Sequence, residues 1–380
     1  MDSTFIPYGR QQIEPDDIES VLDTLRSNWL TTGPLVERFE ASLAQSAGVQ
    51  HAIVVSSGTA ALHAAMHALD IGVGDEVIVP PLTFAATANA VIYQGGTPVF
   101  ADVEPETLLI DPKSVESRIT ARTKAIIAVD YAGQPCDYDA LRTLADRYNL
   151  HLVSDACHSL GCAWRDQPCG SQADLTVFSF HPVKPITTGE GGAIVTSDEV
   201  LASRMRTFRN HGITSDHGQR AKTGSWHYEM VELGFNYRLT DIQCALGLTQ
   251  LTKLQRFIEN RRQVAARYDT AFTQNPTIRP LGVRPEAHHG YHLYVVRVPE
   301  RDRIFSHLRE AGIGANVHYI PVHYHPYYRK LLGTGEGLCP VAESAYREII
   351  SLPIFPGLTV EDQNRVIATL CEAIGQETPR

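Results

Sequence analysis

Short apolar runs alternate with stretches of helical periodicity along the N-terminal half of the chain. The segment HAIVVSSGTAALHAAMHAL at 51–69 joins a β-rich run, a Ser/Gly/Thr turn and an Ala-rich stretch, and so predicts a strand–loop–helix unit. Residues 84–94 and 137–149 have the pattern of helices, and Asp137 stands where it could cap the second. Six more runs have the character of strands, at 76–80, 98–103, 124–130, 151–155, 175–180 and 192–197.

Apolar strands that alternate with helices predict parallel pairing in one large sheet that is covered on both faces. Residues 12–45 precede this sheet and carry helical periodicity, in which the residues that share one face are Ile18, Val21, Leu22 and Leu25.

The pattern changes in the C-terminal third of the chain. Residues 239–272 predict one long helix without proline, and the composition shifts after Pro276 and Pro280. The elements predicted beyond them are a strand at 291–298, a helix at 302–311, a strand at 314–319 and a final helix at 360–374. We therefore expect an α/β fold with a mostly parallel sheet in a large domain over 1–250. Residues 251–380 would form a long connecting helix and a smaller α+β domain.

The charge balance limits the classes of partner. The chain has 380 residues, and 33 Lys+Arg stand against 43 Asp+Glu, for a formal charge of −10. This acidic balance argues against nucleic acid or an anionic membrane surface as the main partner, although a locally positive site could still bind an anionic small molecule. No apolar run approaches the ~20 residues of a membrane helix. The N-terminal residues also lack the basic and apolar regions of a signal peptide.

The cysteines indicate a compartment. There are seven, an odd number, and none forms a CxxC pair. A chain of this length does not need disulfide staples, so we expect free thiols and a cytoplasmic location, and we expect no zinc site.

The segment SFHPVKPITTGEGGAIVTS at 179–197 carries the most chemical information. Lys184 lies between two strand-like runs, and Pro182 and Pro185 on either side exclude a helix. Its neighbours are apolar or small, and a lysine desolvated in this way has a lowered pKa and becomes a usable amine nucleophile. The alternative is an ordinary exposed loop lysine.

Asp155 strengthens the catalytic interpretation of Lys184. It ends the apolar run HLVSD, so it lies at the carboxyl edge of the predicted sheet, where ligands bind in open α/β folds. A helix N-cap is the alternative role for a single aspartate there. An amine and a carboxylate at one edge are what pyridoxal phosphate requires: the amine forms the covalent link, and the carboxylate keeps the ring nitrogen protonated.

A phosphate site is also predicted. Ser57, Gly58 and Thr59 precede a helix, so backbone N–H groups and hydroxyls could hold an anion at the positive helix end, and Ser179 adds another hydroxyl. Simple helix capping is the alternative. Neither GxGxxG after the first strand nor GxxxxGK[ST] occurs, which argues against a dinucleotide oxidoreductase or a P-loop protein.

Four ordered motifs resemble those of a known family. They are DACH at 155–158, SFHPVK at 179–184, GEGG at 189–192 and GFNYR at 234–238. They are similar to the successive motifs of the DegT/DnrJ/EryC1/StrS sugar aminotransferases, which belong to fold-type I of the pyridoxal-phosphate enzymes. Family members with histidine in place of Lys184 perform dehydration, so the lysine favours transamination. Many members also have an acid where this chain has Ser154.

The resemblance implies a role for each matching residue. Lys184 would bind pyridoxal 5′-phosphate covalently, Asp155 would pair with the ring nitrogen, His158 would stand beside the ring, and Phe84 would cover its other face. Phosphate would be bound by Ser57, Gly58, Thr59 and Ser179, together with Asn236 from a neighbouring subunit, because family members build each site across a homodimer interface. The residues expected at the sugar nucleotide and amino donor are Tyr8, Asn28, Trp29, Leu30, Thr31, Ser57, Ser179, Asn236, Arg238, His318 and Tyr319, which would include the N-terminal segment 1–45 in the substrate site.

One branch of the family is especially similar. HPVKPITTGEGG at 181–192 and VDYAG at 129–133 look like the branch that makes the precursor of pseudaminic acid. That branch transfers the amino group of L-glutamate to C4 of a UDP-linked 2-acetamido-2,6-dideoxy-hexos-4-ulose, and its product is UDP-4-amino-4,6-dideoxy-N-acetyl-β-L-altrosamine. The alternatives are an aminotransferase of another UDP- or dTDP-linked 4-ketosugar and a non-catalytic sensor that binds pyridoxal phosphate.

The remaining histidines and arginines favour structural roles. We predict no metal site at the two histidine clusters of the C-terminal third, because no cysteine or acid is interleaved with the histidines. The clusters are His318, His323 and His325, and His288, His289 and His292. For His181 we expect a structural hydrogen bond. For Arg238 we expect pairing with the donor's carboxylate, because a guanidinium suits bidentate binding.

Overall fold

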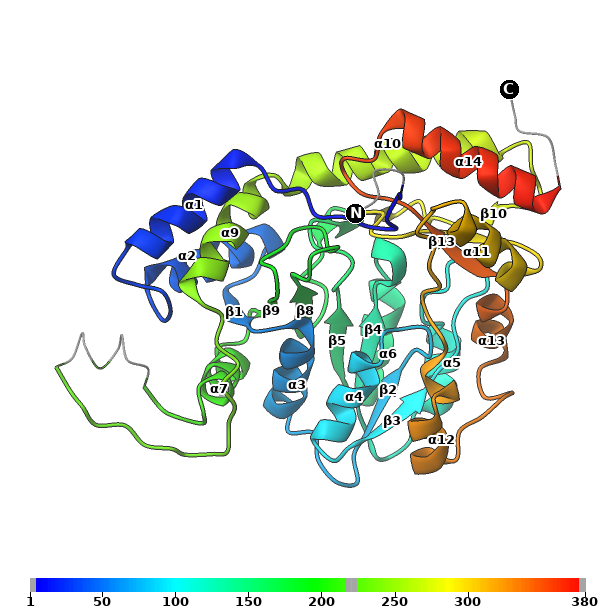
Figure 1. The fold of residues 1–380 in the computed structure, drawn as a ribbon. Coiled ribbons are helices and arrows are strands. Elements are labelled where there is room, and N and C mark those ends of the chain that lie inside the picture. Colours follow the sequence, from blue (N-terminus) through cyan, green and yellow to red (C-terminus); the bar gives the residue numbers. More distant parts are fainter. Residues whose placement is uncertain (1–4, 216–219, 221–223, 376–380) are drawn as a thin grey trace.

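The computed structural model describes residues 5–215, 220 and 224–375, and its centre is a seven-stranded sheet flanked by helices (Figure 1). The strand order is β1-β9-β8-β5-β4-β2-β3. The strands of this sheet are β1 (His51–Val55), β2 (Glu76–Val79), β3 (Thr97–Phe100), β4 (Thr123–Val129), β5 (His151–Asp155), β8 (Leu175–Ser179) and β9 (Gly192–Thr196).

The predicted strands are confirmed, and the pairing is mostly parallel as expected. β3, β2, β4, β5 and β8 pair in parallel along the sheet. β9 pairs antiparallel with both β8 and β1, so it alone in this sheet runs in the opposite direction. The carboxyl ends of β1, β8, β5 and β4 therefore meet at one edge, the position where open α/β sheets bind ligands.

Helices cover both faces of the large sheet. The described helices are α1 (Pro15–Arg26), α2 (Pro34–Ala47), α3 (Gly58–Ala68), α4 (Ala86–Tyr93), α5 (Pro112–Arg118), α6 (Tyr138–Tyr148), α7 (Glu199–Arg209), α9 (Asp241–Thr252), α10 (Leu254–Phe272), α11 (Arg301–Glu310), α12 (Pro326–Leu332), α13 (Pro340–Tyr346) and α14 (Val360–Ile374), with short 3-10 turns at Tyr131–Gly133 (η1) and Val322–Tyr324 (η2).

Successive residues of β1 show how the two faces are buried. Ile53 and Val55 pack in a core with α3, α4 and α6, while Ala52 and Val54 pack in a second core with α2, α9 and α10. Each fully buried side chain of valine or isoleucine size contributes about 1.5–3 kcal/mol relative to exposure. This double burial explains why the strands are continuous apolar runs.

A smaller sheet lies toward the C-terminus. It has the order β10-β12-β13, formed by β10 (Arg279–Pro280), β12 (Tyr294–Arg297) and β13 (Ile349–Leu352). Together with α10, α11 and α14 it encloses its own apolar core, and Figure 1 shows α10 and α14 side by side above it. Another short sheet joins β11 (Ala287–His288), β6 (Ala163–Trp164) and β7 (Gln167–Pro168). The domain boundary at residue 250 stays a prediction.

The helical periodicity predicted over 12–45 is confirmed, and the segment forms two helices, α1 and α2. A loop separates them, and Pro34 begins α2, which excludes a helical conformation for the residue before it. The buried side of α1 is polar: Asp17 and Thr24 are buried, and the Asp17 carboxylate accepts hydrogen bonds from Thr249 and Gln250. The apolar residues Ile18, Leu22 and Leu25 are exposed instead.

Two C-terminal predictions are also corrected. The helix predicted over 239–272 breaks at Lys253, whose Nζ lies 2.7 Å from Asp16 Oδ1 and 2.8 Å from Asp17 Oδ2, so the break places a cation on the acidic start of α1. Residues 314–319 are not a strand. Gly314 N donates to Ile6 O, and Asn316 exchanges backbone hydrogen bonds with Ser351, so this segment has no continuous ladder.

Candidate active site

Three strand ends bring the predicted catalytic residues to one edge of the large sheet. Asp155 is the last residue of β5 and Ser179 the last of β8, and Lys184 follows β8 in the loop before β9. Ser57 follows β1 and caps α3. Asp155 pairs in register with Val177, the middle residue of β8, so the register sets its depth relative to the Lys184 loop.

The Asp155 side chain is buried and held by hydrogen bonds. Thr87 in α4 donates its hydroxyl to Asp155 Oδ2 at 2.7 Å, and the backbone N of Cys157 donates to Oδ1 at 3.3 Å. Thr83 and Thr87 share a further hydroxyl hydrogen bond of 2.7 Å. Donors to both oxygens fix the orientation of the carboxylate.

Lys184 lies in an irregular loop, as its flanking prolines predict. Its backbone N donates to His181 O at 2.9 Å, and the residue is partly buried. Burial lowers the pKa of the Lys184 amine, whereas Cys157 and Asp155 oppose this effect by favouring the cation. A lowered pKa makes the neutral, nucleophilic amine easier to reach.

A buried guanidinium supports the Lys184 loop from the small sheet's side. Arg261 of α10 donates to Val183 O at 3.4 Å and to Ile354 O at 3.1 Å. Burial lowers the pKa of Arg261 to about 10. A narrow space of about 10 Å³ beside it is lined in part by Arg10, Lys184 and Pro185.

Aromatic residues gather next to Asp155. His158 is buried, and its Nε2 lies 3.2 Å from the hydroxyl of Tyr319. The ring of Phe84, which is exposed, lies 6.3 Å from that of Tyr319. On the other side, His318 lies beside Tyr319 and 5.3 Å from the ring of Tyr8. The structure thus gathers four other predicted site residues near His158: Phe84, Tyr319, His318 and Tyr8.

Ser57, Gly58 and Ser179 form a cradle at the N-terminus of α3. Ser57 Oγ accepts a hydrogen bond from Ala60 N at 3.1 Å, so its own proton can be donated to an anion. A Cβ built on Gly58 would lie 3.0 Å from Ser179 Cβ and 3.3 Å from Cys157 Sγ, so a side chain would crowd the cradle. Thr59, partly buried, occupies the next position of the helix.

Other predicted residues lie farther out. Asn28, Trp29, Leu30 and Thr31 are exposed in the loop between α1 and α2, and Leu30 O accepts a hydrogen bond from Asp241 N at the start of α9. Asn236 is exposed, next to Tyr237, whose carbonyl accepts from Ser56 N. Arg238 donates to Asn210 Oδ1 at 2.8 Å.

The residues that sequence reasoning missed are long-range partners. Thr87 is one, and Asp130 at the end of β4 is another: its carboxylate accepts hydrogen bonds from Cys136 N, Tyr138 and Ser159. Tyr138 also bonds to Ser154, the position where many family members have an acid. Burial raises the pKa of Asp130 to about 6. Only the location of Asp130 at a strand end could have suggested it.

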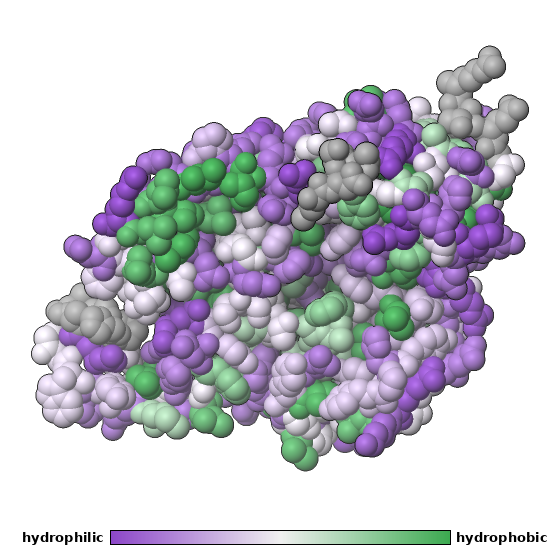
Figure 2. All heavy atoms as spheres, in the orientation of Figure 1, coloured by the Kyte–Doolittle hydropathy of each residue, from purple (hydrophilic) through white to green (hydrophobic). Residues whose placement is uncertain are grey.

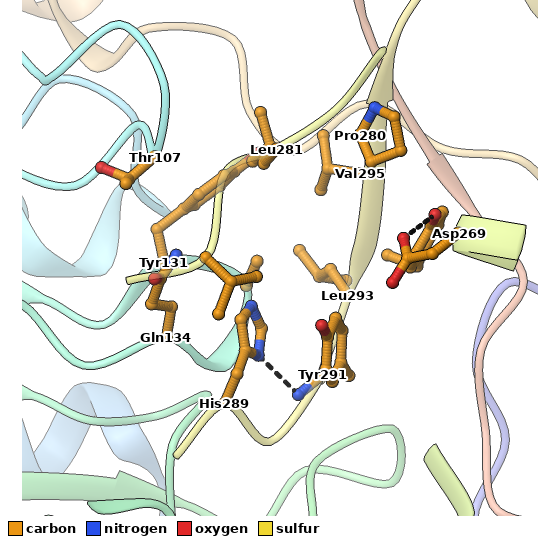
Figure 3. A pocket seen from close by; sticks show the side chains of 13 residues that line it. Thr107, Tyr131, Gln134, Asp269, Pro280, Leu281, His289, Tyr291, Leu293 and Val295 are labelled. Atoms are coloured by element: carbon orange, nitrogen blue, oxygen red, sulfur yellow. Dashed lines mark hydrogen bonds between the residues drawn. The ribbon is translucent and has the colours of Figure 1, made fainter. Parts of the chain in front are cut away.

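A separate cavity of about 250 Å³ lies away from Lys184, between η1, α10 and the segment 280–295 (Figure 3). Its walls include Tyr131, Asp269, His289, Tyr291 and Leu293, and none of the residues that line it is a lysine or an arginine. Without a cationic side chain it is poorly suited to a phosphate compound. Tyr131 links it to the candidate site by donating a hydrogen bond to His318 O.

The residues at the sheet edge fit pyridoxal phosphate. They offer the desolvated amine of Lys184 and the buried carboxylate of Asp155, which accepts a hydrogen bond from Thr87. At the N-terminus of α3 they also offer three hydroxyls around Gly58, where there is no room for a side chain. Lys184, Asp155 and the cradle would hold its aldehyde, ring nitrogen and phosphate, respectively. Within the described ranges, no group of three or more His, Cys, Asp or Glu residues could hold a metal ion. No described helix is long and apolar enough to span a membrane.

Comparisons with known proteins give consistent matches. The model of the DegT/DnrJ/EryC1/StrS aminotransferase family matches residues 11–371. The spore coat polysaccharide biosynthesis protein SpsC of Bacillus subtilis (strain 168) is 41% identical over 378 residues, 97% of each chain. Helicobacter pylori PseC, an aminotransferase involved in the biosynthesis of pseudoaminic acid, is 34% identical with a TM-score of 0.91, over 98% of this chain and 99% of PseC. The Streptococcus pneumoniae protein Spr1654, a candidate sugar aminotransferase, is 34% identical in its PMP form, with a TM-score of 0.92 over 97% and 99% of the two chains.

The hydrogen bond from Thr87 to Asp155 makes a prediction. In Thr87→Val, the side chain keeps its shape but loses the donor, and a hydrogen bond to a charged group contributes about 1.5–3 kcal/mol. We expect the dissociation constant of pyridoxal phosphate to rise about tenfold or more, measured by titrating the apoenzyme with cofactor and following the visible absorption band.

Thr196→Val is the matched control, because Thr196 is buried at the opposite edge of the sheet and donates to Asp174 O. It should lower thermal stability without changing cofactor affinity. Equal cofactor affinity in Thr87→Val and the wild type would show that this hydrogen bond does not support the cofactor site.

Proposed function

The chain belongs to the DegT/DnrJ/EryC1/StrS aminotransferase family, and we propose that it transfers the amino group of L-glutamate to C4 of a UDP-linked 2-acetamido-2,6-dideoxy-hexos-4-ulose. The family expected from the motifs is confirmed: the protein is a pyridoxal-phosphate-dependent sugar aminotransferase with a fold-type I architecture. The proposed product is UDP-4-amino-4,6-dideoxy-N-acetyl-β-L-altrosamine, a precursor of pseudaminic acid.

The observation that carries the catalytic part of the proposal is the placement of Lys184 and Asp155 at one sheet edge. When bound, pyridoxal phosphate supplies a cationic ring that withdraws electrons from the substrate's reacting carbon. Lys184 would hold the cofactor through Nζ, and Asp155, oriented by Thr87, would accept a hydrogen bond from the protonated ring nitrogen.

Lys184 also moves the proton. With glutamate in the site, the Lys184 amine, when not bonded to the cofactor, would remove the proton from the glutamate Cα and then release it again within the site. The lowered pKa of Lys184 suits this exchange, because an amine with a pKa closer to neutrality can both accept and release a proton. The cofactor would keep the amino group when 2-oxoglutarate leaves and would supply it to C4 of the ketosugar, with Lys184 again moving the proton.

The sugar assignment is supported by two local similarities and one structural relative. The motifs at 129–133 and 181–192 resemble the pseudaminic acid branch, and PseC acts in the biosynthesis of that sugar. SpsC, named for spore coat polysaccharide, supports the alternative of another nucleotide-linked 4-ketosugar. The sensor alternative would share the cofactor site and lack turnover.

We also propose that the enzyme is a homodimer with shared active sites. An apolar patch on α1 and the chain on either side of it is exposed, and Figure 2 shows a hydrophobic area over α1. This α1 patch is defined as Ile13, Ile18, Leu22, Leu25, Trp29 and Leu30. Residues 224–235 extend away from the sheet in Figure 1 and expose Trp226, Met230 and Leu233. Contact with a second copy would bury both surfaces and bring Asn236 toward the partner's phosphate.

A cytoplasmic location completes the proposal. All seven cysteines are unpaired in the structure, and a reducing compartment keeps such thiols reduced.

Lys184→Ala tests the catalytic assignment. Without the amine, we expect the visible band of the lysine-bound cofactor to disappear and kcat to fall by ~10³-fold or more, since the acid–base step alone contributes 10²–10⁴-fold. The matched control Lys330→Ala removes an exposed lysine of α12 and should keep both the band and turnover. A Lys184→Ala variant with the wild-type band and turnover would eliminate Lys184 as the cofactor lysine.

A substrate panel tests the sugar. The purified enzyme is incubated with glutamate and UDP- or dTDP-linked 4-ketosugars, and the product is identified by NMR. We expect the highest kcat/KM with the UDP-linked 2-acetamido-2,6-dideoxy-hexos-4-ulose and an amino group at C4. A higher kcat/KM with another sugar would select the first alternative, and cofactor binding without release of 2-oxoglutarate from any pair would select the sensor.

Ile18→Asp tests the dimer. A charge placed in a buried apolar contact is costly, so the dimer dissociation constant should rise about tenfold or more, as measured by sedimentation velocity. Val360→Asp changes a similarly exposed residue of α14 and should leave the mass unchanged. A monomeric wild type at micromolar concentration would contradict the dimer, and an unchanged mass in Ile18→Asp would exclude the α1 patch from the interface.

A further inference from the structure

A second histidine packs directly against the histidine of the candidate site. The rings of His158 and His292 lie 4.2 Å apart between centroids, at an interplanar angle of 41°. Both side chains are buried, with 5% of each exposed. The Nδ1 atom of each ring is buried without a hydrogen-bond partner among the described residues. Two unpaired imidazole nitrogens in one contact are unusual, because buried polar atoms are normally bonded.

The backbone holds His292 firmly in this place. Gly290 N donates to Gly133 O at 2.9 Å, and Leu293 N donates to Ala132 O at 3.2 Å, so the segment is fastened to η1. Gly133 has φ +93, and a Cβ there would lie 2.9 Å from both His158 O and His292 N. The close approach of His158 and His292 therefore depends on a glycine at position 133.

Neighbouring side chains on the segment point elsewhere. His289, Tyr291 and Leu293 line the cavity of Figure 3, whereas His292 contacts His158. Of these residues, His292 is the one whose ring contacts the candidate site, at His158. Because His292 lies just before β12 and His158 just after β5, their contact connects the small sheet to the large one.

The electrostatic surroundings keep both rings neutral. The pKa of His158 lies well below its ordinary value because of burial, with Lys184 and His318 adding to the effect. The pKa of His292 is lowered in the same way by burial and by His158, Lys184, Arg261 and His318. Neutral rings can pack against each other next to the Lys184 cation without charge repulsion.

We propose that His292 is a positioning residue whose ring supports His158 from behind and thereby fixes the plane that His158 presents to the cofactor ring. This inference rests on the proposed role of His158 beside the cofactor. The contact acts through the ring of His292 rather than through its Nδ1 atom, which has no hydrogen-bond partner among the described residues. Tyr319 restrains the edge of His158 through Nε2, and His292 restrains its face.

The test compares His292→Ala with His292→Phe. Removing the ring should weaken cofactor binding about fivefold, which corresponds to about 1 kcal/mol, the middle of the 0.5–1.5 kcal/mol range of an aromatic contact. It should also shift the wavelength of the visible band. Phe restores a ring and should return both values to within about threefold of the wild type. Both are measured by cofactor titration of the apoenzyme, without sugar substrate.

His289→Ala is the matched control, because His289 is a buried histidine on the same segment that faces the cavity instead. It should alter the melting temperature but neither cofactor affinity nor the band. The inference is overturned if His292→Ala binds cofactor with the wild-type affinity and band. It is equally overturned if His292→Phe keeps the wild-type melting temperature but is as impaired as His292→Ala. A band that survived in Lys184→Ala would count against the proposed cofactor site and not against His292.

Discussion

The parallel register of β4, β5 and β8 is the constraint on which the candidate site depends. Because these strands run in the same direction, Asp130, Asp155 and Ser179 emerge at one edge, and the Lys184 loop begins there. β9 returns antiparallel, so Gly192 stands opposite both Val55 and Ser179 and closes the loop over the start of α3. A one-residue slip of β5 would turn the Asp155 side chain to the other face of the sheet and separate it from Thr87.

The local charge at the candidate site differs from the net charge of the protein. The protein carries a formal charge of −10, yet a sugar aminotransferase with pyridoxal phosphate handles an anionic cofactor. The positive potential comes from local sources: the N-terminus of α3, the hydroxyls around Gly58, and Lys184 and Arg261. Neither cation forms an ion pair with a carboxylate within 4 Å among the described residues, so its charge is available to the site. The net charge argues against nucleic acid and anionic membranes as partners, but it does not give the local charge at the cofactor site.

Local patterns predicted the strands, and with them Lys184 and Asp155, because a strand end and a proline-bounded loop are visible within ten residues of sequence. Thr87 and His292 could not be predicted in this way. Thr87 reaches Asp155 across 68 positions of sequence, and His292 meets His158 through a glycine turn on another strand end. Such contacts are tertiary, and no periodicity encodes them. The apolar spacing of α1 is clear from the sequence, but the spacing does not show which side packs within the chain. The polar side packs, on Thr249, Gln250 and Lys253.

The small C-terminal sheet is part of the site rather than an appendage to it. Arg261 of α10 binds the carbonyl next to Lys184 and, through Ile354 O, the chain that follows β13. His318 bonds through Nδ1 to Ser351 of β13 and lies beside Tyr319, which meets His158. These contacts from the small sheet's side approach the lysine loop and the histidine, while the large sheet positions the Asp155 carboxylate and the cradle of Ser57, Gly58 and Ser179. A shift of the small sheet would therefore move Lys184 and His158 together relative to Asp155, so the packing between the two sheets sets the geometry of the reaction.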